Sequence, residues 1–358
     1  MLLADLGAEV IRLERPAAPG ADGILAPGAW NVLHRGRPSV AIDLKRSDAR
    51  ELVIRLCGSA DALIEGFRPG VMERLGLGPS DVLERCSRLV YGRVTGYGQE
   101  GPMANAAGHD INYIATAGVL GALARHGERP LFPLNLLGDF GGGGMLMALG
   151  VVSAVLEARS SGRGQVVDAA MVDGASLLAA LIFGLHSGGF WTDVPGTNFL
   201  DSGAHFYEVY ATADKGYMAV GALEPQFYSA LLGVLDIPPA EAPQWDRERW
   251  PELTRRFAEV FETRTRDEWT TLFASVDACA TPVYSLAEAP LHPHMAARGT
   301  FVEVDGVVQP GPAPRFNRTP GSISRAPADP GADTDTALNH WGVTEEELVA
   351  LRATGAIG

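Results

Sequence analysis

The sequence LNLLGDFGGGGMLMALG, residues 134–150, places one carboxylate, Asp139, directly before four glycines and an apolar run. Apolar positions recur without a break to residue 159, and SSGRGQ (160–165) then ends the pattern before VVDAAMV (166–172). This order predicts a buried helix over residues 141–159, stopped by glycines and followed by a strand. The stretch therefore indicates a helix that packs beside a sheet.

Asp139 has two interpretations. The simpler is a helix N-cap, which accepts hydrogen bonds from the first backbone N–H groups. In the functional interpretation, the glycines let a ligand approach the backbone, and the helix N-terminus supplies donors for a developing negative charge. The two roles are compatible, and local sequence leaves both open.

Toward the N-terminus, β-rich runs alternate with helical patterns. Strands are predicted at AEVIRLE (8–14), PSVAIDL (38–44), DALIEGF (61–67) and LVYGRVTG (89–96), with a helix over residues 47–60 and two short helices through Arg85. Such βαβ units indicate an α/β domain with a largely parallel sheet. Loops at DLKR, GFRPG and TGYG follow the strand ends, where open α/β sheets bind ligands.

Toward the C-terminus, a buried helix over residues 173–186 is followed by a turn-rich linker. Strands FYEVYAT (206–212), GYMAVGAL (216–223) and TPVYS (281–285), with helices near 226–234, 248–262 and 266–275, predict a smaller second domain. Residues 304–332 are dense in Pro, Gly and Ala and predict an extended strap, and TEEELVALRATG (344–355) predicts a closing helix.

Composition excludes several classes of function. A net charge of −14 argues against a nucleic-acid surface, which needs a basic face. The three cysteines, Cys57, Cys86 and Cys279, are too few and too widely spaced for a disulfide framework or a zinc site. No uninterrupted apolar run reaches the length of a membrane span, and the N-terminus has no signal-peptide pattern. We expect a cytoplasmic protein without a nucleic-acid or membrane partner and without a metal.

Two further side chains are candidates for proton chemistry. His109, in AAGHDINYIATAG, lies in a small-residue loop, and its type titrates near neutral pH. Glu224 ends a strand before Pro225, so a simple helix cap is its alternative role. The arginines Arg15, Arg68 and Arg74 lie on or after strand-edge loops, where they could clamp a phosphorylated ligand. None of these signals decides a function alone.

Taken together, the motifs resemble the superfamily of family III CoA-transferases (CaiB/BaiF type) and α-methylacyl-CoA racemases along the whole chain. They are LLADLGAEVIRLERP, VAIDLK, LIEGFRPGVMERLGLGP, GRVTGYGQEGP, AGHDINYIATAG, PLNLLGDFGGGG, SSGRGQVVDAAMVDG and MAVGALEPQFY. The resemblance implies a Rossmann-like large domain plus a smaller α+β domain in an interlocked homodimer. It implies a large domain over residues 1–185, a linker over 186–204, a small domain over 205–295 and a strap that returns over 296–358.

The resemblance also implies roles for the candidate residues. In the transferases the aspartate at Asp139 is a nucleophile; in the racemases it is one of two bases, with a histidine at His109 as the other and a glutamate at Glu224 in support. This chain has all three, and it carries NFLDSGAHFYEVY where transferases tend to have a glycine-rich loop. Both features favour the racemase branch, which inverts the carbon next to an acyl-CoA thioester through an enolate. A CoA-transferase and an inactive acyl-CoA-binding protein remain alternatives.

By the same resemblance, CoA is part of the substrate and no separate cofactor is implied. The residues implied to bind CoA are Arg15, Ile42, Asp43, Leu44, Lys45, Gly66, Phe67, Arg68, Arg74, Gly108, Asp110, Ile111, Asn112 and Tyr113. Met145, Met147 and Met171 are candidates for an apolar surface under the acyl chain, although such methionines are more often core. Relatives begin a strand and a glycine-containing turn earlier, so we expect Met1 to be an internal methionine and the start to be misassigned.

Overall fold

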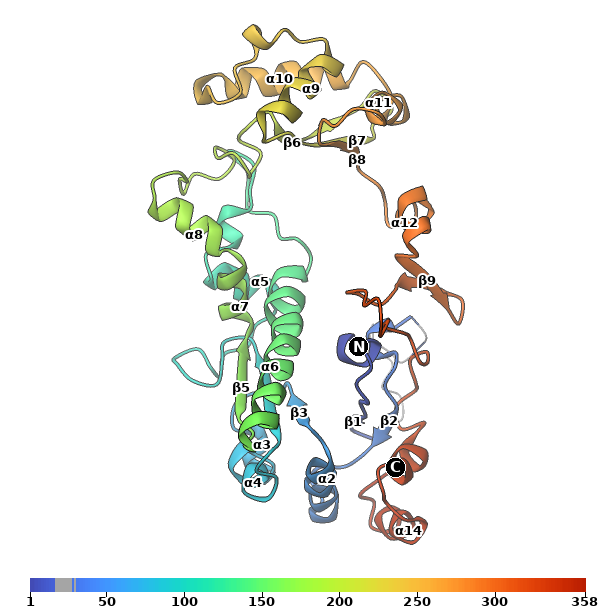
Figure 1. Ribbon diagram of the computed structural model, residues 1–358. Coiled ribbons are helices and arrows are strands. Elements are labelled where there is room, and N and C mark those ends of the chain that lie inside the picture. The colour runs from blue at the N-terminus through green and yellow to red at the C-terminus, as the bar shows by residue number, and fades with distance from the viewer. Residues whose placement is uncertain (17–27, 29) are drawn as a thin grey trace. The chain divides into compact units, whose positions relative to one another are not determined.

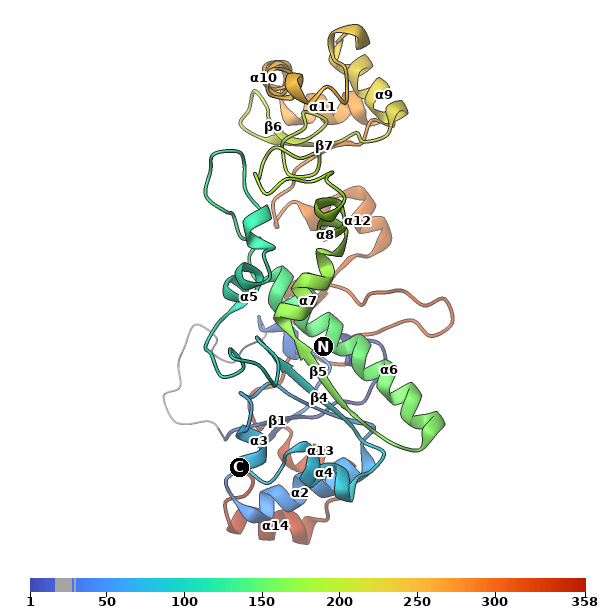
Figure 2. The same ribbon diagram turned by 90° about the vertical axis from the view of Figure 1, so that its left-hand side faces the viewer.

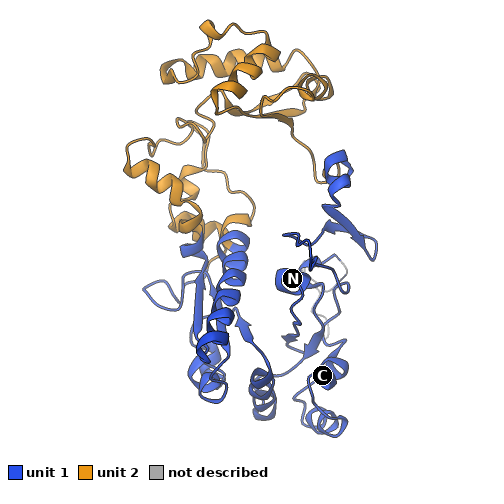
Figure 3. Ribbon diagram, viewed as in Figure 1, with its two compact units in different colours: residues 1–107, 139–174, 290–358 blue, residues 108–138, 175–289 orange. Residues whose placement is uncertain are grey.

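The computed structural model describes residues 1–16, 28 and 30–358 (Figure 1). The chain divides into two compact units (Figure 3): unit 1 comprises Met1–Ala107, Asp139–Gly174 and Pro290–Gly358, and unit 2 comprises Gly108–Gly138 and Ala175–Ala289. Both chain ends belong to unit 1. This division differs from the expected domain limits, because residues 108–138 and 175–204 group with unit 2.

Unit 1 contains two parallel sheets. In the first, β1 (Arg12–Glu14) pairs with β2 (Ser39–Ala41); in the second, β3 (Ala62–Glu65), β4 (Val90–Thr95) and β5 (Val166–Ala170) lie in the order β3-β4-β5. Helices connect β3 to β4 and β4 to β5, as is usual between parallel strands. The predicted α/β class is confirmed.

Several α-helices belong to unit 1. They are α1 (Leu2–Asp5), α2 (Ser47–Ser59), α3 (Val71–Arg74), α4 (Pro79–Arg85), α6 (Leu146–Ser161), α12 (Pro293–Arg298), α13 (Thr334–His340) and α14 (Glu345–Ala353). One buried cluster joins α2, α13 and α14 to strands of both sheets, including Val40 and Tyr91. In another, Met147, Val151 and Ala154 of α6 pack on β4 and β5, along which α6 lies in Figure 2.

The predicted strap begins with a hairpin that the sequence reading missed. Strands β9 (Phe301–Val304) and β10 (Val307–Pro310) pair antiparallel around Asp305 and Gly306, both of which have positive φ. An Asp-Gly pair is a strong two-residue hairpin signal. The extended-strap prediction over residues 304–332 was therefore wrong for residues 304–310, because the Pro and Gly content of the following residues obscured this turn.

The glycine-rich stretch is helical from an earlier point than predicted. A π-helix, η3 (Leu136–Met145), runs directly into α6, so the continuous helix spans Leu136–Ser161. Among the described residues this is the one helix long and apolar enough, by length and composition, to cross a membrane, and about a third of its most apolar window is buried. The helix is longer than the one predicted over residues 141–159, because the four glycines continue the helix and do not precede it.

Unit 2 combines an antiparallel sheet with helices. Strands β6 (Tyr207–Ala211), β7 (Tyr217–Gly221) and β8 (Ala280–Pro282) lie in the order β6-β7-β8. Its helices include α5 (Asp110–Thr116), α8 (Ala180–Ser187), α9 (Pro225–Leu235), α10 (Trp250–Phe261) and α11 (Arg266–Phe273). Large aromatic side chains such as Phe206, Trp250 and Phe257 fill the core. The helix predicted over residues 173–186 is two helices, α7 (Met171–Leu178) and α8, separated at Ala179.

The segment predicted as a linker is tied into unit 2. Asn198 is fully buried, and its side chain bonds to the backbone of Thr192 and to the carboxylate of Asp201. That carboxylate also accepts the backbone N–H groups of Gly196, Asn198 and Gly203. The glycines and turn residues from which a linker was predicted form this closely hydrogen-bonded loop.

Candidate active site

Asp139 lies inside the first turn of the π-helix η3, three residues after its start. The N-cap prediction for Asp139 was therefore wrong: the helix begins at Leu136. In a π-helix the N–H of residue i bonds the carbonyl of residue i−5, so the first five N–H groups precede the ladder, and such helices occur often at functional sites. Asp139 is half-buried and belongs to the turn whose backbone N–H groups precede the ladder.

At least one of the four glycines allows two backbones to touch. A Cβ atom on Gly174 of α7 would lie 2.1 Å from the carbonyl oxygen and 2.4 Å from the Cα of Gly142. Real side chains do not tolerate such distances, so glycine is required at position 174 and α7 packs directly on η3. Part of the glycine block therefore serves helix packing.

His109 is the N-cap residue of α5, with extended backbone angles (φ −133°, ψ 177°). The side chain of Asn112 accepts the backbone N–H of His109 at 3.1 Å, which completes the start of the helix. The imidazole of His109 is exposed. The capping interpretation thus applies to its backbone and leaves its ring available for chemistry.

The chain neighbours of His109 and Asp139 are in direct contact within unit 2. The carboxylate of Asp110 accepts the backbone N–H of Gly138 at 2.6 Å. A Cβ atom on Gly138 would approach this carboxylate to 2.9 Å and the Cα of Asp110 to 3.2 Å, so the contact requires glycine. This contact ties the first residue of α5 to the residue before Asp139.

Glu224 is the N-cap residue of α9, directly before Pro225, and its side chain is exposed. The partial positive charge of a helix N-terminus stabilises a carboxylate at this place. Glu224 was predicted to lie between the end of a strand and the start of a helix. The structure confirms this position, because β7 ends at Gly221 and α9 begins at Pro225. The neighbouring thiol of Cys279 has a raised pKa, chiefly through burial and then through the charges of Asp277 and Glu224.

The candidate CoA-binding residues of unit 1 follow strand ends. Arg15 comes after β1, residues 42–45 come between β2 and α2, and residues 66–68 come directly after β3, while Arg74 ends α3. Lys45, Arg68 and Arg74 are exposed. Gly108 to Tyr113 belong to unit 2, where the hydroxyl of Tyr113 donates to the carbonyl of Gly108.

A buried ion network beneath the 66–68 loop was not predicted. Arg93 of β4 donates to Glu65 at 2.8 Å and to Glu73 at 2.7 Å, and Glu65 also accepts the backbone N–H of Phe67 at 2.6 Å. The pKa of Glu73 is lowered, first by its hydrogen bond from Arg93. Sequence reading missed the network because its partners come from three elements; an arginine inside a β-rich run was the only signal.

The three candidate methionines differ in exposure. Met147 is buried in the core, where its sulfur lies so close to Gly92 that a Cβ there would approach it to 2.8 Å. Met145 is 60% exposed and Met171 is half-buried. The prediction of an acyl-binding role for Met147 is therefore corrected to a packing role, whereas Met145 and Met171 remain candidates.

Comparisons with known proteins agree with these motifs. A model of the family CoA-transferase family III matches residues 1–336. The chain belongs to this family. The α-methylacyl-CoA racemase of Mus musculus is 45% identical over 358 residues, and that of Homo sapiens is 42% identical over 359 residues; each alignment covers 99% of this chain and 91% of the relative.

Solved structures of the family show the same fold. The crystal structure of Rv3272 from M. tuberculosis has a TM-score of 0.75 and 27% sequence identity, and the alignment covers 93% of this chain and 92% of that one. The predicted mixed α/β fold of family III is thereby confirmed.

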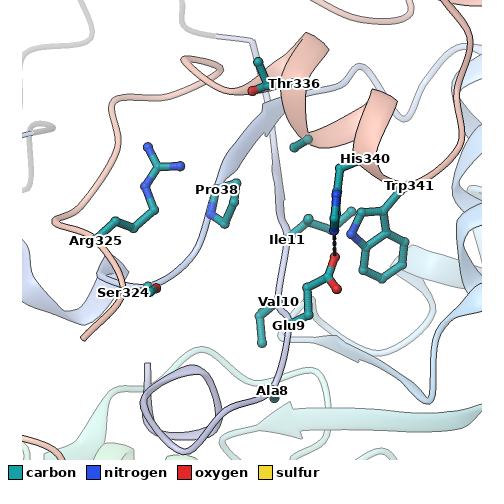
Figure 4. A pocket seen from close by; sticks show the side chains of 12 residues that line it. Ala8, Glu9, Val10, Ile11, Pro38, Ser324, Arg325, Thr336, His340 and Trp341 are labelled. Carbon is teal, nitrogen blue, oxygen red and sulfur yellow. Dashed lines mark ion pairs between the residues drawn. The ribbon is translucent and has the colours of Figure 1, made fainter. Parts of the chain in front are cut away.

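Unit 1 of this family III chain has a small pocket beside its N-terminal segment (Figure 4). Its volume is about 450 Å³, and Val10, Ile11 and Trp341 supply apolar walls. Glu9 and His340 form an ion pair of 3.2 Å within it. Of the described residues that line it, none is a candidate catalytic or CoA-binding residue.

A larger pocket of about 1080 Å³ lies wholly within unit 2. It is formed by the residues after α5, by α8 and by the closely bonded loop around Asn198, and apolar surface predominates on its walls. In the described ranges, residues 1–16, 28 and 30–358, no cluster of three or more His, Cys, Asp or Glu side chains is placed to hold a metal ion.

Proposed function

We infer that this chain is an α-methylacyl-CoA racemase, an isomerase that interconverts the 2R and 2S forms of 2-methylacyl-CoA thioesters. The observation that carries this conclusion is the identity of 45% and 42% with two such racemases over 99% of the chain.

The proposed chemistry uses two bases on opposite faces of the substrate. One base removes the α-proton, the electron pair of the C–H bond moves into the thioester carbonyl to give an enolate, and the second acid returns a proton to the other face. In one direction ionised Asp139 abstracts and protonated His109 donates; in the other, neutral His109 abstracts and the protonated carboxyl of Asp139 donates. The 2.6 Å contact between Asp110 and Gly138 supports this pairing, because it joins the segments that carry the two residues.

The enolate oxygen needs donors at the place where charge develops. The first turn of η3 provides backbone N–H groups that precede the i−5 ladder, and fixed dipoles of this kind stabilise an oxyanion without reorganisation. We assign to Glu224 the orientation of the His109 imidazole and the stabilisation of its cation. Whether it does so within a subunit or across a dimer is part of the test below.

CoA is proposed to bind along the strand-end loops of unit 1 and at the start of α5. The exposed cations Lys45, Arg68 and Arg74 suit phosphate groups, and guanidinium groups can bind them through two hydrogen bonds at once. The residues proposed to contact CoA are Arg15, Ile42, Asp43, Leu44, Lys45, Gly66, Phe67, Arg68, Arg74, Gly108, Asp110, Ile111, Asn112 and Tyr113.

We also propose that the chain forms a homodimer. The support for this proposal is one exposed apolar face of the continuous helix formed by η3 and α6. Met145, Leu149, Val152 and Leu156 are 60%, 64%, 55% and 71% exposed and recur at spacings of four, three and four residues, which forms one stripe. The opposite face of α6 packs on β4 and β5. A membrane span would pull α6 off the sheet and expose that core, so a second copy of the chain is the better cover.

The test is α-proton exchange. The purified protein is incubated with a pure 2R-2-methylacyl-CoA in deuterated buffer, and both the α-proton signal and the diastereomer ratio are followed. We expect exchange with approach to a mixed ratio, lowered by about 10²–10⁴-fold in His109→Ala and in Asp139→Ala. His340→Ala, which removes a histidine of unit 1 outside the proposed site, should exchange the α-proton at the wild-type rate. Mixing His109→Ala with Glu224→Ala subunits tests the across-dimer arrangement, because only that arrangement restores activity in mixed dimers.

A CoA-transferase gives the opposite result. In that case no α-proton would exchange, an added carboxylic acid would acquire CoA from the thioester, and a covalent adduct would form on Asp139. His109→Ala would then be tolerated.

A further inference from the structure

Among the described residues that line the pocket of unit 2, none is a candidate catalytic or CoA-binding residue. Its volume of about 1080 Å³ is at the upper end of the range of roughly 300–1,000 Å³ that small-molecule sites occupy. We propose that it binds the distal apolar end of a long or ring-bearing acyl chain, and so sets the acyl specificity of the enzyme. This inference rests on the proposed racemase activity.

The place of the pocket relative to His109 supports this assignment. His109 precedes α5, and Gly118 and Val119, which line the pocket, follow the same helix. A helix of seven residues is about 10 Å long. An acyl chain whose α-carbon lies at His109 therefore reaches the pocket only if it extends for about the length of α5.

A second segment that lines the pocket lies close in sequence to Asp139, the other candidate base. Leu131, Phe132 and Pro133 line the pocket and directly precede the helix that carries Asp139. The Asp110–Gly138 hydrogen bond holds the two segments together. Both segments that carry the proposed bases thus also form the pocket.

Several apolar side chains that line the pocket are largely exposed to solvent. Leu131 is 74% exposed, and Phe132 and Phe183 are each 50% exposed. Apolar side chains gathered around a concavity are typical of a site for an apolar ligand. An acyl chain would remove this surface from water.

Two of the charged groups in the pocket are already paired. Arg125 donates two hydrogen bonds to Glu208, at 2.7 and 2.8 Å, and His186 lies 3.2 Å from Asp193. The charge of Arg125 is therefore compensated by Glu208 before a ligand enters. This arrangement favours an apolar group over an anionic one.

The wall opposite α8 is held in a fixed shape. Asp201 accepts hydrogen bonds from three backbone N–H groups and from the side chain of Asn198. A Cβ on Gly196 would lie 2.1 Å from the backbone nitrogen of His126, so the two loops that flank the pocket touch through their backbones. A pocket with such walls does not collapse when it is empty, and it discriminates by size.

The experiment fills the pocket and compares two substrates. Ala179→Phe places a ring at a residue that lines the pocket, and Ala122→Phe does so from a different segment, in case the first variant folds poorly. Ala180→Phe is the matched control, because Ala180 is the exposed neighbour outside the lining. Each variant is assayed by α-proton exchange with 2-methyldecanoyl-CoA and with 2-methylbutanoyl-CoA.

We expect both filling variants to raise KM for 2-methyldecanoyl-CoA by about tenfold or more, the usual effect of steric misfit in an apolar pocket. Exchange on 2-methylbutanoyl-CoA should stay within about twofold of the wild type, because this chain is too short to pass α5. Equal losses on both thioesters would overturn the proposal. Unchanged kinetics on both would overturn it as well.

Failure of the racemase proposal is distinguishable from failure of the pocket proposal. If the wild type exchanges no α-proton, calorimetric titration with 2-methyldecanoyl-CoA and with CoASH still compares binding of the acyl part. Weaker binding of the acyl thioester alone in Ala179→Phe would support the pocket. Equal weakening of both ligands would contradict it.

Discussion

Arg93 and Glu65 form a buried ion pair, with 2.8 Å between Nε and Oε1 and only 5% and 6% of the two residues exposed. The second oxygen of Glu65 accepts the backbone N–H of Phe67 at 2.6 Å. One carboxylate thus connects the centre of the sheet to the loop that is proposed to bind CoA. Arg93 does not reach the ligand itself, so it is a positioning residue.

Arg93→Met should weaken CoA binding more than it slows proton transfer. Without Arg93 the buried Glu65 carboxylate reorients, and the Phe67 backbone loses its anchor. We expect KM for the thioester and Kd for CoASH to rise about tenfold, whereas kcat should stay within about threefold of the wild-type value. This is the pattern expected when a variant loses binding that is equal in the ground state and the transition state. Steady-state exchange kinetics and calorimetry measure both quantities.

The matched control is Arg35→Met. Arg35 also belongs to unit 1 and pairs with Asp5 at 2.6 Å, with 2% of each side chain exposed. Each substitution leaves a buried carboxylate and should destabilise the protein by about 3–5 kcal/mol. If both variants raise KM equally, the effect of Arg93 is general destabilisation and the positioning role is refuted.

Gly138→Ala should abolish proton exchange without unfolding the protein. The added Cβ would lie 2.9–3.2 Å from Asp110, so the start of α5 and the residue before Asp139 must separate. Displacement of a catalytic group by about 1 Å typically costs on the order of 100-fold in rate. Gly144→Ala is the control, because its Cβ would make an ordinary contact of 3.6 Å with the carbonyl of Asp139. Comparable rates in the two variants would show that the contact has no role in catalysis.

Leu149→Glu should break the proposed dimer. Leu149 is 64% exposed within the apolar stripe of α6, so a charge there is harmless to the single subunit and unfavourable at an apolar interface. Sedimentation velocity should show a dimer for the wild type and a monomer for the variant. Glu157→Lys, a charge change at the edge of the same helix, is expected to remain dimeric. A monomeric wild type would remove the support for the dimer.

The sequence predicted those features that depend on local pattern. The strands around Val40, Ile64 and Val90 alternate with helices, as the structure confirms. The capping sequence at Thr344 is also present, with its side chain accepting the N–H of Glu347. Hydrophobic periodicity and capping chemistry are properties of neighbouring residues and are therefore visible in sequence.

Other features depend on contacts between distant residues and were missed. Five of the ten residues of η3 are glycines, which carry no apolar signal, so the helix start at Leu136 was not predicted and Asp139 was taken for its cap. The pairing of Arg93 with Glu65 and Glu73 joins residues 20 and 28 positions apart. The large pocket combines segments from both sides of the 139–174 insertion. Such juxtapositions follow from tertiary packing, which overrides local preference.

The stability of unit 2 should depend on pH through His205. This histidine is fully buried, and burial, followed by the charge of Arg249, lowers its pKa from 6.5 to about 4. The unfolded chain therefore binds a proton more tightly between these values. Stability from this group is fully present above pH 6.5 and is lost as the pH falls toward 4, with a total effect of about 3 kcal/mol.

His205→Phe isolates this contribution. A phenyl ring keeps the packing against Phe206 and Phe257, and the Tyr228 hydroxyl retains its hydrogen bond of 2.9 Å to the carbonyl of Ala242. Denaturant unfolding at pH 7 and at pH 4.5 should show a smaller loss of stability in the variant than in the wild type. His34 of unit 1, whose pKa burial also lowers to about 4, accounts for part of the dependence that remains. An equal loss in both proteins would mean that His205 is protonated in the folded state, so that its buried ring has a partner for the cation.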